Sequence, residues 1–78
     1  MKALDAAQFV HGMEALGVYM AAMVDQDGKP NGWYRSVGIA SEEEYQLLAW
    51  VNADQANNDA VVQYLIETCQ FHVVARAA

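Results

Sequence analysis

The chain has few of the features that mark disulfide-bonded, secreted or membrane-spanning proteins. Cys69 is the single cysteine among 78 residues, which excludes an internal disulfide and fits a reducing compartment. Its apolar stretches fall well short of the roughly 18 residues that span a bilayer, and its first residues lack the apolar core of a signal peptide. We therefore expect a soluble, cytoplasmic protein that folds as a single small domain over residues 1–78.

Basic residues are also scarce, because four lysines and arginines stand against ten aspartates and glutamates, giving a net charge of −6. The four are spread along the chain and form no basic stripe: Lys2, Lys29, Arg35 and Arg76. Direct binding to nucleic acid or to an anionic membrane is therefore not expected. A basic surface on another protein is the better electrostatic match, although the same charge also serves solubility.

Motifs of catalysis and of phosphate or metal binding are missing as well. No Gly-rich phosphate loop occurs, and neither serine lies in G-x-S-x-G. Cys69 and His72 have a spacing found in zinc sites, but a structural site needs four ligands and there is no second cysteine. Cys69 with His11 or His72 would also suit a thiol nucleophile and its base, yet a lone cysteine on an apolar helix stripe is more typical of packing. We predict no enzyme activity, cofactor or metal site.

The most polar stretch is DQDGKPNG, residues 25–32, and we interpret it as a turn. An EF-hand calcium loop needs oxygen ligands at positions 1, 3, 5 and 12 and glycine at position 6. Neither register that uses Asp25 and Asp27 meets this requirement, because other ligand positions fall on residues that cannot bind calcium. Its two glycines and Pro30 suit a tight connection instead.

Hydrophobic periodicity predicts a helix and two strands in the first half of the chain. Residues 4–17 form an amphipathic helix that Asp5 can cap and Gly17 can end. The uniformly apolar residues 18–24 and the β-prone residues 33–40 then form two antiparallel strands around the turn. In the second strand, alternation places Trp33 and Arg35 on one face and Tyr34 on the other.

The second half of the chain predicts two helices and a last strand. Ser41 caps a helix over 41–54 and forms a capping box with Glu44. Its predicted buried stripe consists of Tyr45, Leu47, Leu48 and Val51. After an interruption at 55–58, Asn58 or Asp59 caps a helix that runs to residue 70, and 71–78 form a strand with Phe71 and Val73 inward.

The order α-β-β-α-α-β predicts an α+β fold, a two-layer sandwich. It consists of a small, mostly antiparallel three-stranded sheet with helices on one face. The alternative is an all-α bundle, in which residues 18–24 extend the first helix. Because 18–24 are apolar on both faces while helices cover one, we expect a homodimer in which a second copy covers the other face.

The leading functional interpretation is a non-enzymatic, acidic protein-interaction module. One concrete form is an inhibitor that blocks a basic, nucleic-acid-binding surface of a larger protein. In size and charge alone, the chain resembles phage anti-defence proteins such as anti-CRISPRs. The alternative is a regulatory domain that binds a small ligand between Trp33, Tyr34 and Tyr19. The predicted partner-binding residues are Glu42, Glu43, Trp33, Tyr34, Asp25 and Asp27.

Overall fold

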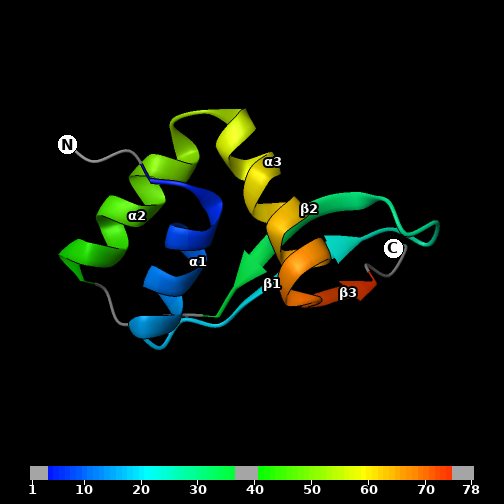
Figure 1. Ribbon diagram of the computed structural model, residues 1–78, viewed down its shortest axis with the longest axis horizontal. Helices are drawn as coiled ribbons and strands as arrows, with labels where there is room; N and C mark the ends of the chain where they lie inside the picture. Colours follow the sequence, from blue (N-terminus) through cyan, green and yellow to red (C-terminus); the bar gives the residue numbers. More distant parts are fainter. Residues whose placement is uncertain (1–3, 37–40, 75–78) are drawn as a thin grey trace.

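The computed structural model describes residues 4–36 and 41–74, which form the predicted α+β architecture (Figure 1). The elements are α1 (Ala6–Ala15), β1 (Met20–Val24), β2 (Pro30–Arg35), α2 (Glu42–Asn52), α3 (Gln55–Tyr64), the π-helical turn η1 (Leu65–Cys69) and β3 (His72–Val74). The all-α alternative is wrong, because the residues after Gly17 form a strand. Predicted strand residues 37–40 and 75–78 lie outside the described residues. Within the described ranges, no helix is both long and apolar enough to cross a bilayer.

Helix α1 begins and ends where its sequence predicts. The Asp5 carboxylate accepts a hydrogen bond from Gln8 N–H at 2.8 Å, and the Gln8 side chain accepts one from Asp5 N–H at 3.1 Å. Gly17, with φ of 80°, follows the last turn. A methyl group added at Gly12 would lie 3.1 Å from Leu47 of α2, so glycine at this position lets the two helices approach closely.

Helix α2 is capped by Ser41 as predicted, but its buried stripe differs. The Ser41 hydroxyl accepts a hydrogen bond from Glu44 N–H at 3.1 Å. Tyr45 is 75% exposed, whereas Glu44 is only 5% exposed. The inward face therefore starts at Glu44, whose carboxylate pairs with Arg35 of β2 instead of closing a capping box.

Helix α3 begins earlier than predicted, because Asp54 caps it and not Asn58 or Asp59. The Asp54 carboxylate accepts a hydrogen bond from Ala56 N–H at 3.0 Å. The Asn57 and Asn58 amides donate to the carbonyls of Trp50 and Val51, at 2.9 and 2.6 Å. Both carbonyls lie in the last turn of α2, where carbonyls lack their usual helical partners; the Trp50 carbonyl also accepts a hydrogen bond from Ala53 N–H at 3.3 Å. The asparagines that suggested an interruption in fact join α2 to α3.

The sheet has the order β2-β1-β3. Strands β1 and β2 are antiparallel, with Ala22 opposite Trp33, whereas the short β3 runs parallel to β1. Strand β2 starts at Pro30, so the turn is confined to residues 25–29. There the Asp25 carboxylate accepts hydrogen bonds from the N–H groups of Asp27 and Lys29, both at 2.9 Å.

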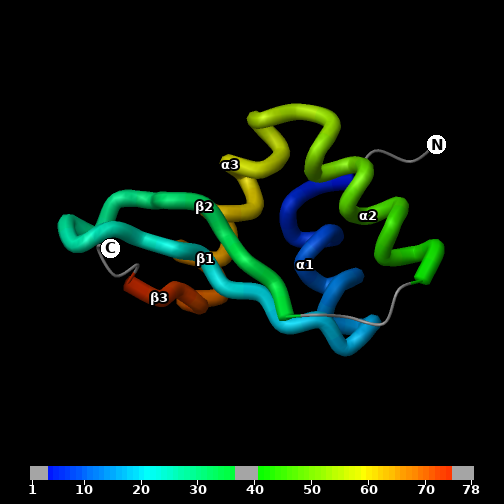
Figure 2. Tube along the Cα trace, turned by 180° about the vertical axis from the view of Figure 1, so that it is seen from behind, coloured from blue at the N-terminus to red at the C-terminus, as the bar shows by residue number. Residues whose placement is uncertain are grey.

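The two faces of the sheet have different surroundings. One face packs on the helices: α3 and η1 cross in front of the strands in Figure 1, and the strands lie in front in Figure 2, seen from behind. Met20 and Ala22 join the core there, together with Phe9, Val10, Met13, Val18, Val51, Val61, Val62 and Leu65. We call the other side the outer sheet face; it carries Tyr19, Ala21, Met23, Tyr34, Phe71 and Val73.

The prediction that Phe71 and Val73 point inward is wrong, since they are 43% and 41% exposed. The parallel register pairs Val73 with Met23, and directly paired residues point to the same side of a sheet. All three residues of β3 are exposed, so this strand adds no side chain to the buried core on either face.

Candidate functional site: an acidic groove beside the hairpin

A groove with a volume of about 910 Å³ lies between the β1–β2 hairpin and the helix formed by α3 and η1. On the helix side its lining follows two rows with a spacing of four residues. The inner row is Asn58, Val62 and Ile66, which are partly or fully buried. The outer row, which we call the acidic rim, is Gln55, Asp59, Gln63 and Glu67, all exposed.

Trp33 forms the aromatic part of the opposite wall and is held by polar and aromatic contacts. Its indole N–H donates to the Asn58 side-chain oxygen at 3.0 Å, and the Asn58 amide in turn donates to Val51. The ring packs edge-on against buried Phe9, with centroids 5.8 Å apart at an angle of 69°. The indole is thus positioned before any ligand arrives.

Pro30 and two glycines form the rest of the hairpin wall. Gly28 and Gly32 have φ values of 81° and 103°, in the region that favours glycine. A methyl group added at either position would meet no atom within 4 Å. The wall beside Trp33 is therefore open at both glycines.

The charge of the groove is entirely negative. Asp59 accepts a hydrogen bond from the Gln55 amide at 3.0 Å, and Glu67 accepts one from the Gln63 amide at 3.2 Å. These neutral donors orient the carboxylates without cancelling their charge. Among the described residues that line the groove there is no lysine or arginine.

The predicted partner-binding residues fall into three separate regions. Trp33 lines the groove, and Asp25 and Asp27 lie in the adjoining turn, although the turn itself uses the Asp25 carboxylate. Tyr34 lies on the outer sheet face. Glu42 and Glu43 begin α2, at the opposite end of the molecule from the turn (Figure 1).

Tyr19, Trp33 and Tyr34 do not share a pocket, because Trp33 faces the helices while both tyrosines lie on the outer sheet face. Sequence reasoning also missed the acidic rim. Its signal is present in the sequence, since Gln55, Asp59, Gln63 and Glu67 recur every four residues and alternate amide with carboxylate.

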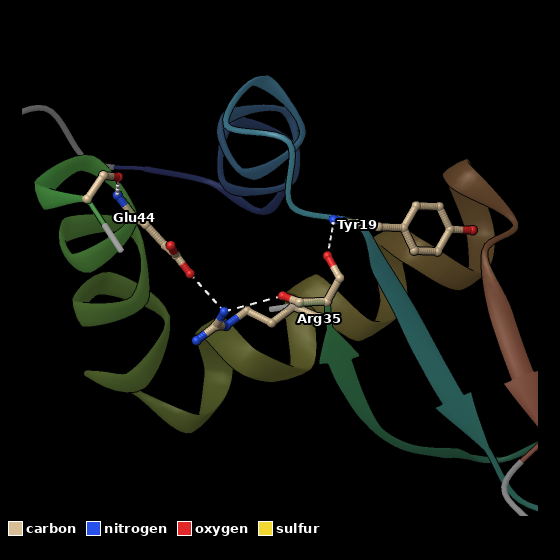
Figure 3. A network of polar contacts seen from close by, with 5 residues as sticks. Tyr19, Arg35 and Glu44 are labelled. Carbon is tan, nitrogen blue, oxygen red and sulfur yellow. Dashed lines mark hydrogen bonds and ion pairs between the residues drawn. The ribbon is translucent and has the colours of Figure 1, made fainter. Parts of the chain in front are cut away.

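A second polar cluster joins the sheet to α2 (Figure 3). Arg35 Nη1 lies 2.7 Å from Glu44 Oε1, and the two side chains are 33% and 6% exposed. Arg35 also donates to the Ser36 carbonyl at 3.4 Å, and the Ser36 hydroxyl accepts from Tyr19 N–H at 2.9 Å. This cluster fixes β2 against α2 and the start of β1, which indicates a structural role.

Cys69 lies at the end of η1, near Tyr64 and α1. The wider π turn brings residues five apart onto the same side, which places Cys69 beside Tyr64. The Tyr64 hydroxyl is 3.2 Å from Nε2 of His11. Burial raises the pKa of the Cys69 thiol and the Glu14 carboxylate raises it further, while hydrogen bonding with Tyr64 lowers it in part. A raised pKa keeps the thiolate scarce, the opposite of what a cysteine nucleophile needs.

Within the described residues, no group of three or more His, Cys, Asp or Glu side chains is placed to hold a metal ion. The Cys69 and His72 pair therefore gains no further ligand there. The chain matches no protein-family model, no curated protein and no solved structure.

Proposed function

We propose that the chain is a non-enzymatic interaction module that binds a basic surface of another protein. The observation that carries the proposal is the charge of the described surface. All ten aspartates and glutamates lie in the described ranges, and Glu44 is the only one that forms an ion pair with a lysine or arginine there. Besides the paired Arg35, those ranges contain a single lysine or arginine, Lys29. Such uncompensated charge attracts basic partners and repels nucleic acid.

A partner that normally binds nucleic acid fits this surface best. The molecule is 38 Å long, and carboxylates lie towards both ends, at Asp27 in the turn and at Glu42 and Glu43 of α2. One helical turn of DNA spans a similar length, about 34–36 Å. The module is thus long enough to cover the stretch of basic surface that one turn of DNA occupies, and it would compete with the nucleic acid for that surface.

Affinity capture from the native host identifies the partner, and kinetics with the purified partner then test the proposal. Binding of the wild-type chain is expected to weaken steeply with added salt and to be displaced by DNA or RNA. The double variant E42Q/E43Q should associate more slowly, while its fold loses only about a few tenths of a kcal/mol per residue. Binding that is indifferent to salt and to nucleic acid would contradict the proposal.

We also propose that two copies associate through the outer sheet face. Tyr19, Tyr34, Phe71 and Val73 are between 41% and 54% exposed there, and the rings of Tyr19 and Phe71 pack at a centroid distance of 5.7 Å. None of the described side chains on this face is charged. It is therefore a surface on which two chains of net charge −6 can meet without opposing carboxylates.

Light scattering across a dilution series measures this association. We expect the apparent mass to approach twice the chain mass as concentration rises, and the V73E variant to stay monomeric because it places a charge at the contact. Val73 is 41% exposed, so the variant should keep its fold. A wild-type chain that remains a monomer at millimolar concentration would show that the outer sheet face does not pair copies.

A further inference from the structure

We propose that the groove is the site that holds the partner, and that it takes an extended basic segment of the partner chain. This inference rests on the proposed function and adds which surface makes contact and what chemistry it recognises. Its occupant is a segment with two arginines or lysines on the acidic rim and apolar side chains against Trp33, Val62 and Ile66.

The length of the groove favours a peptide over a small molecule. Its helix side runs from Gln55 to Glu67, which is roughly 18 Å at the helical rise of about 1.5 Å per residue. An extended chain advances about 3.3 Å per residue, so roughly five residues of a partner would lie along it. A ligand of that length has enough side chains to contact the rim and the inner row together.

The spacing of the rim carboxylates specifies the sequence pattern of this segment. Asp59 and Glu67 are eight residues apart on the helix, or roughly 12 Å along its axis. In an extended chain, residues four apart lie on the same side and about 13 Å from each other. Two basic residues at the first and fifth positions of such a segment can therefore pair with both carboxylates. The second and fourth residues point to the opposite side of the extended chain, towards the indole and the inner row. The pattern is basic–apolar–any–apolar–basic.

The groove is already arranged for such a ligand. Gln55 and Gln63 orient the two carboxylates, and Asn58 holds the indole of Trp33. These hydrogen bonds favour side-chain positions that suit the ligand, which lowers the entropy lost on binding. The floor offers apolar surface mainly at the half-buried Ile66, because Val62 is only 5% exposed, so a segment with basic residues alone would use only part of the site.

The probe is a phage-displayed library of random dodecapeptides, selected on the full chain, followed by synthesis of the enriched peptides with a fluorophore. We expect enrichment of the pattern above. Fluorescence anisotropy should show that D59N/E67Q weakens binding about tenfold, as expected for the loss of two exposed ion pairs. The matched control is E42Q/E43Q, which also removes two carboxylates but at the far end of the molecule; although it should slow association with the whole partner, it should change the affinity of the short groove peptide less than about twofold.

Three outcomes would overturn the assignment of the groove. They are equal weakening of peptide binding by D59N/E67Q and E42Q/E43Q, enriched peptides that lack basic residues, and a library that yields no peptide at all. If free arginine binds as tightly as the peptides, the groove is a site for a small cationic ligand and not for a peptide. None of these results contradicts the proposed function if the captured partner still binds with a steep salt dependence. Partner binding that ignores salt would instead refute that function, whatever the peptides do.

Discussion

The F9A variant is expected to lose about 3–5 kcal/mol of folding free energy, the usual cost of removing a fully buried phenylalanine ring. Phe9 is 0% exposed, and its ring lies 5.8 Å from Trp33 and 5.6 Å from Trp50, measured between centroids. This one side chain therefore joins α1 to β2 and to α2. Domains of this length have a total free energy of unfolding of only about 4–12 kcal/mol, so the expected loss in F9A is a large part of it.

Urea denaturation followed by circular dichroism measures the change, with F9L as the control. Leucine keeps much of the apolar volume, so F9L should lose clearly less than F9A. Because Phe9 supports the indole, peptide binding in the groove should also weaken in F9L. A loss below about 1 kcal/mol in F9A would mean that the ring is not the centre of this core.

Local signals were sufficient to predict most of the elements. Asp5 and Ser41 have the side chains that cap helices, and both do so. The apolar residues before Asp25 form a strand, and the following polar stretch contains the turn. Each of these predictions depended on residues close together in the chain, whose interactions can be read without knowing the fold.

Most errors came from contacts between one element and the next, which local patterns do not specify. Glu44 and not Tyr45 faces inward, because Arg35, nine positions earlier, supplies the partner charge. Asn57 and Asn58 resemble helix breakers until the carbonyls of the preceding helix are seen as their acceptors. The parallel pairing of β3 with β1 likewise depends on how η1 returns the chain to the sheet, which periodicity does not specify.

The candidate site was predicted only in part. Trp33 was identified from its residue type, as an aromatic beside a glycine-rich turn, and it does line the groove. Asp59 and Glu67 were not identified, because their four-residue spacing marks one face of a helix but does not show that this face lines a groove. They form part of a site only because the hairpin packs beside that face.

Breaking the ion pair between Arg35 and Glu44 should produce the other large effect. The R35M variant is expected to lose roughly 2–3 kcal/mol, because it leaves a buried carboxylate without its partner. The value lies below the usual range for a buried pair because the Arg35 side chain is 33% exposed and its charge is partly screened. The E44L variant should lose less folding free energy than R35M, because the freed Arg35 guanidinium can turn towards water while the new leucine packs against the core.

The double variant R35M/E44L completes a thermodynamic cycle in urea denaturation. It should recover most of the stability lost in R35M, because two apolar side chains replace a pair that burial makes costly. Equal losses in R35M and E44L, or no recovery in the double variant, would mean that the pair is not the source of the effect.

This cycle also separates stability from binding. Glu44 is the one carboxylate in the described ranges whose charge a lysine or arginine already neutralises, so it is the one least available to a basic partner. R35M removes a positive charge and leaves every rim and turn carboxylate in place. Where R35M is still folded, its association with a basic partner should therefore be as fast as that of the wild type or faster, despite the lower stability. A slower association would indicate that Arg35 itself contacts the partner, and that the partner's surface is not uniformly basic.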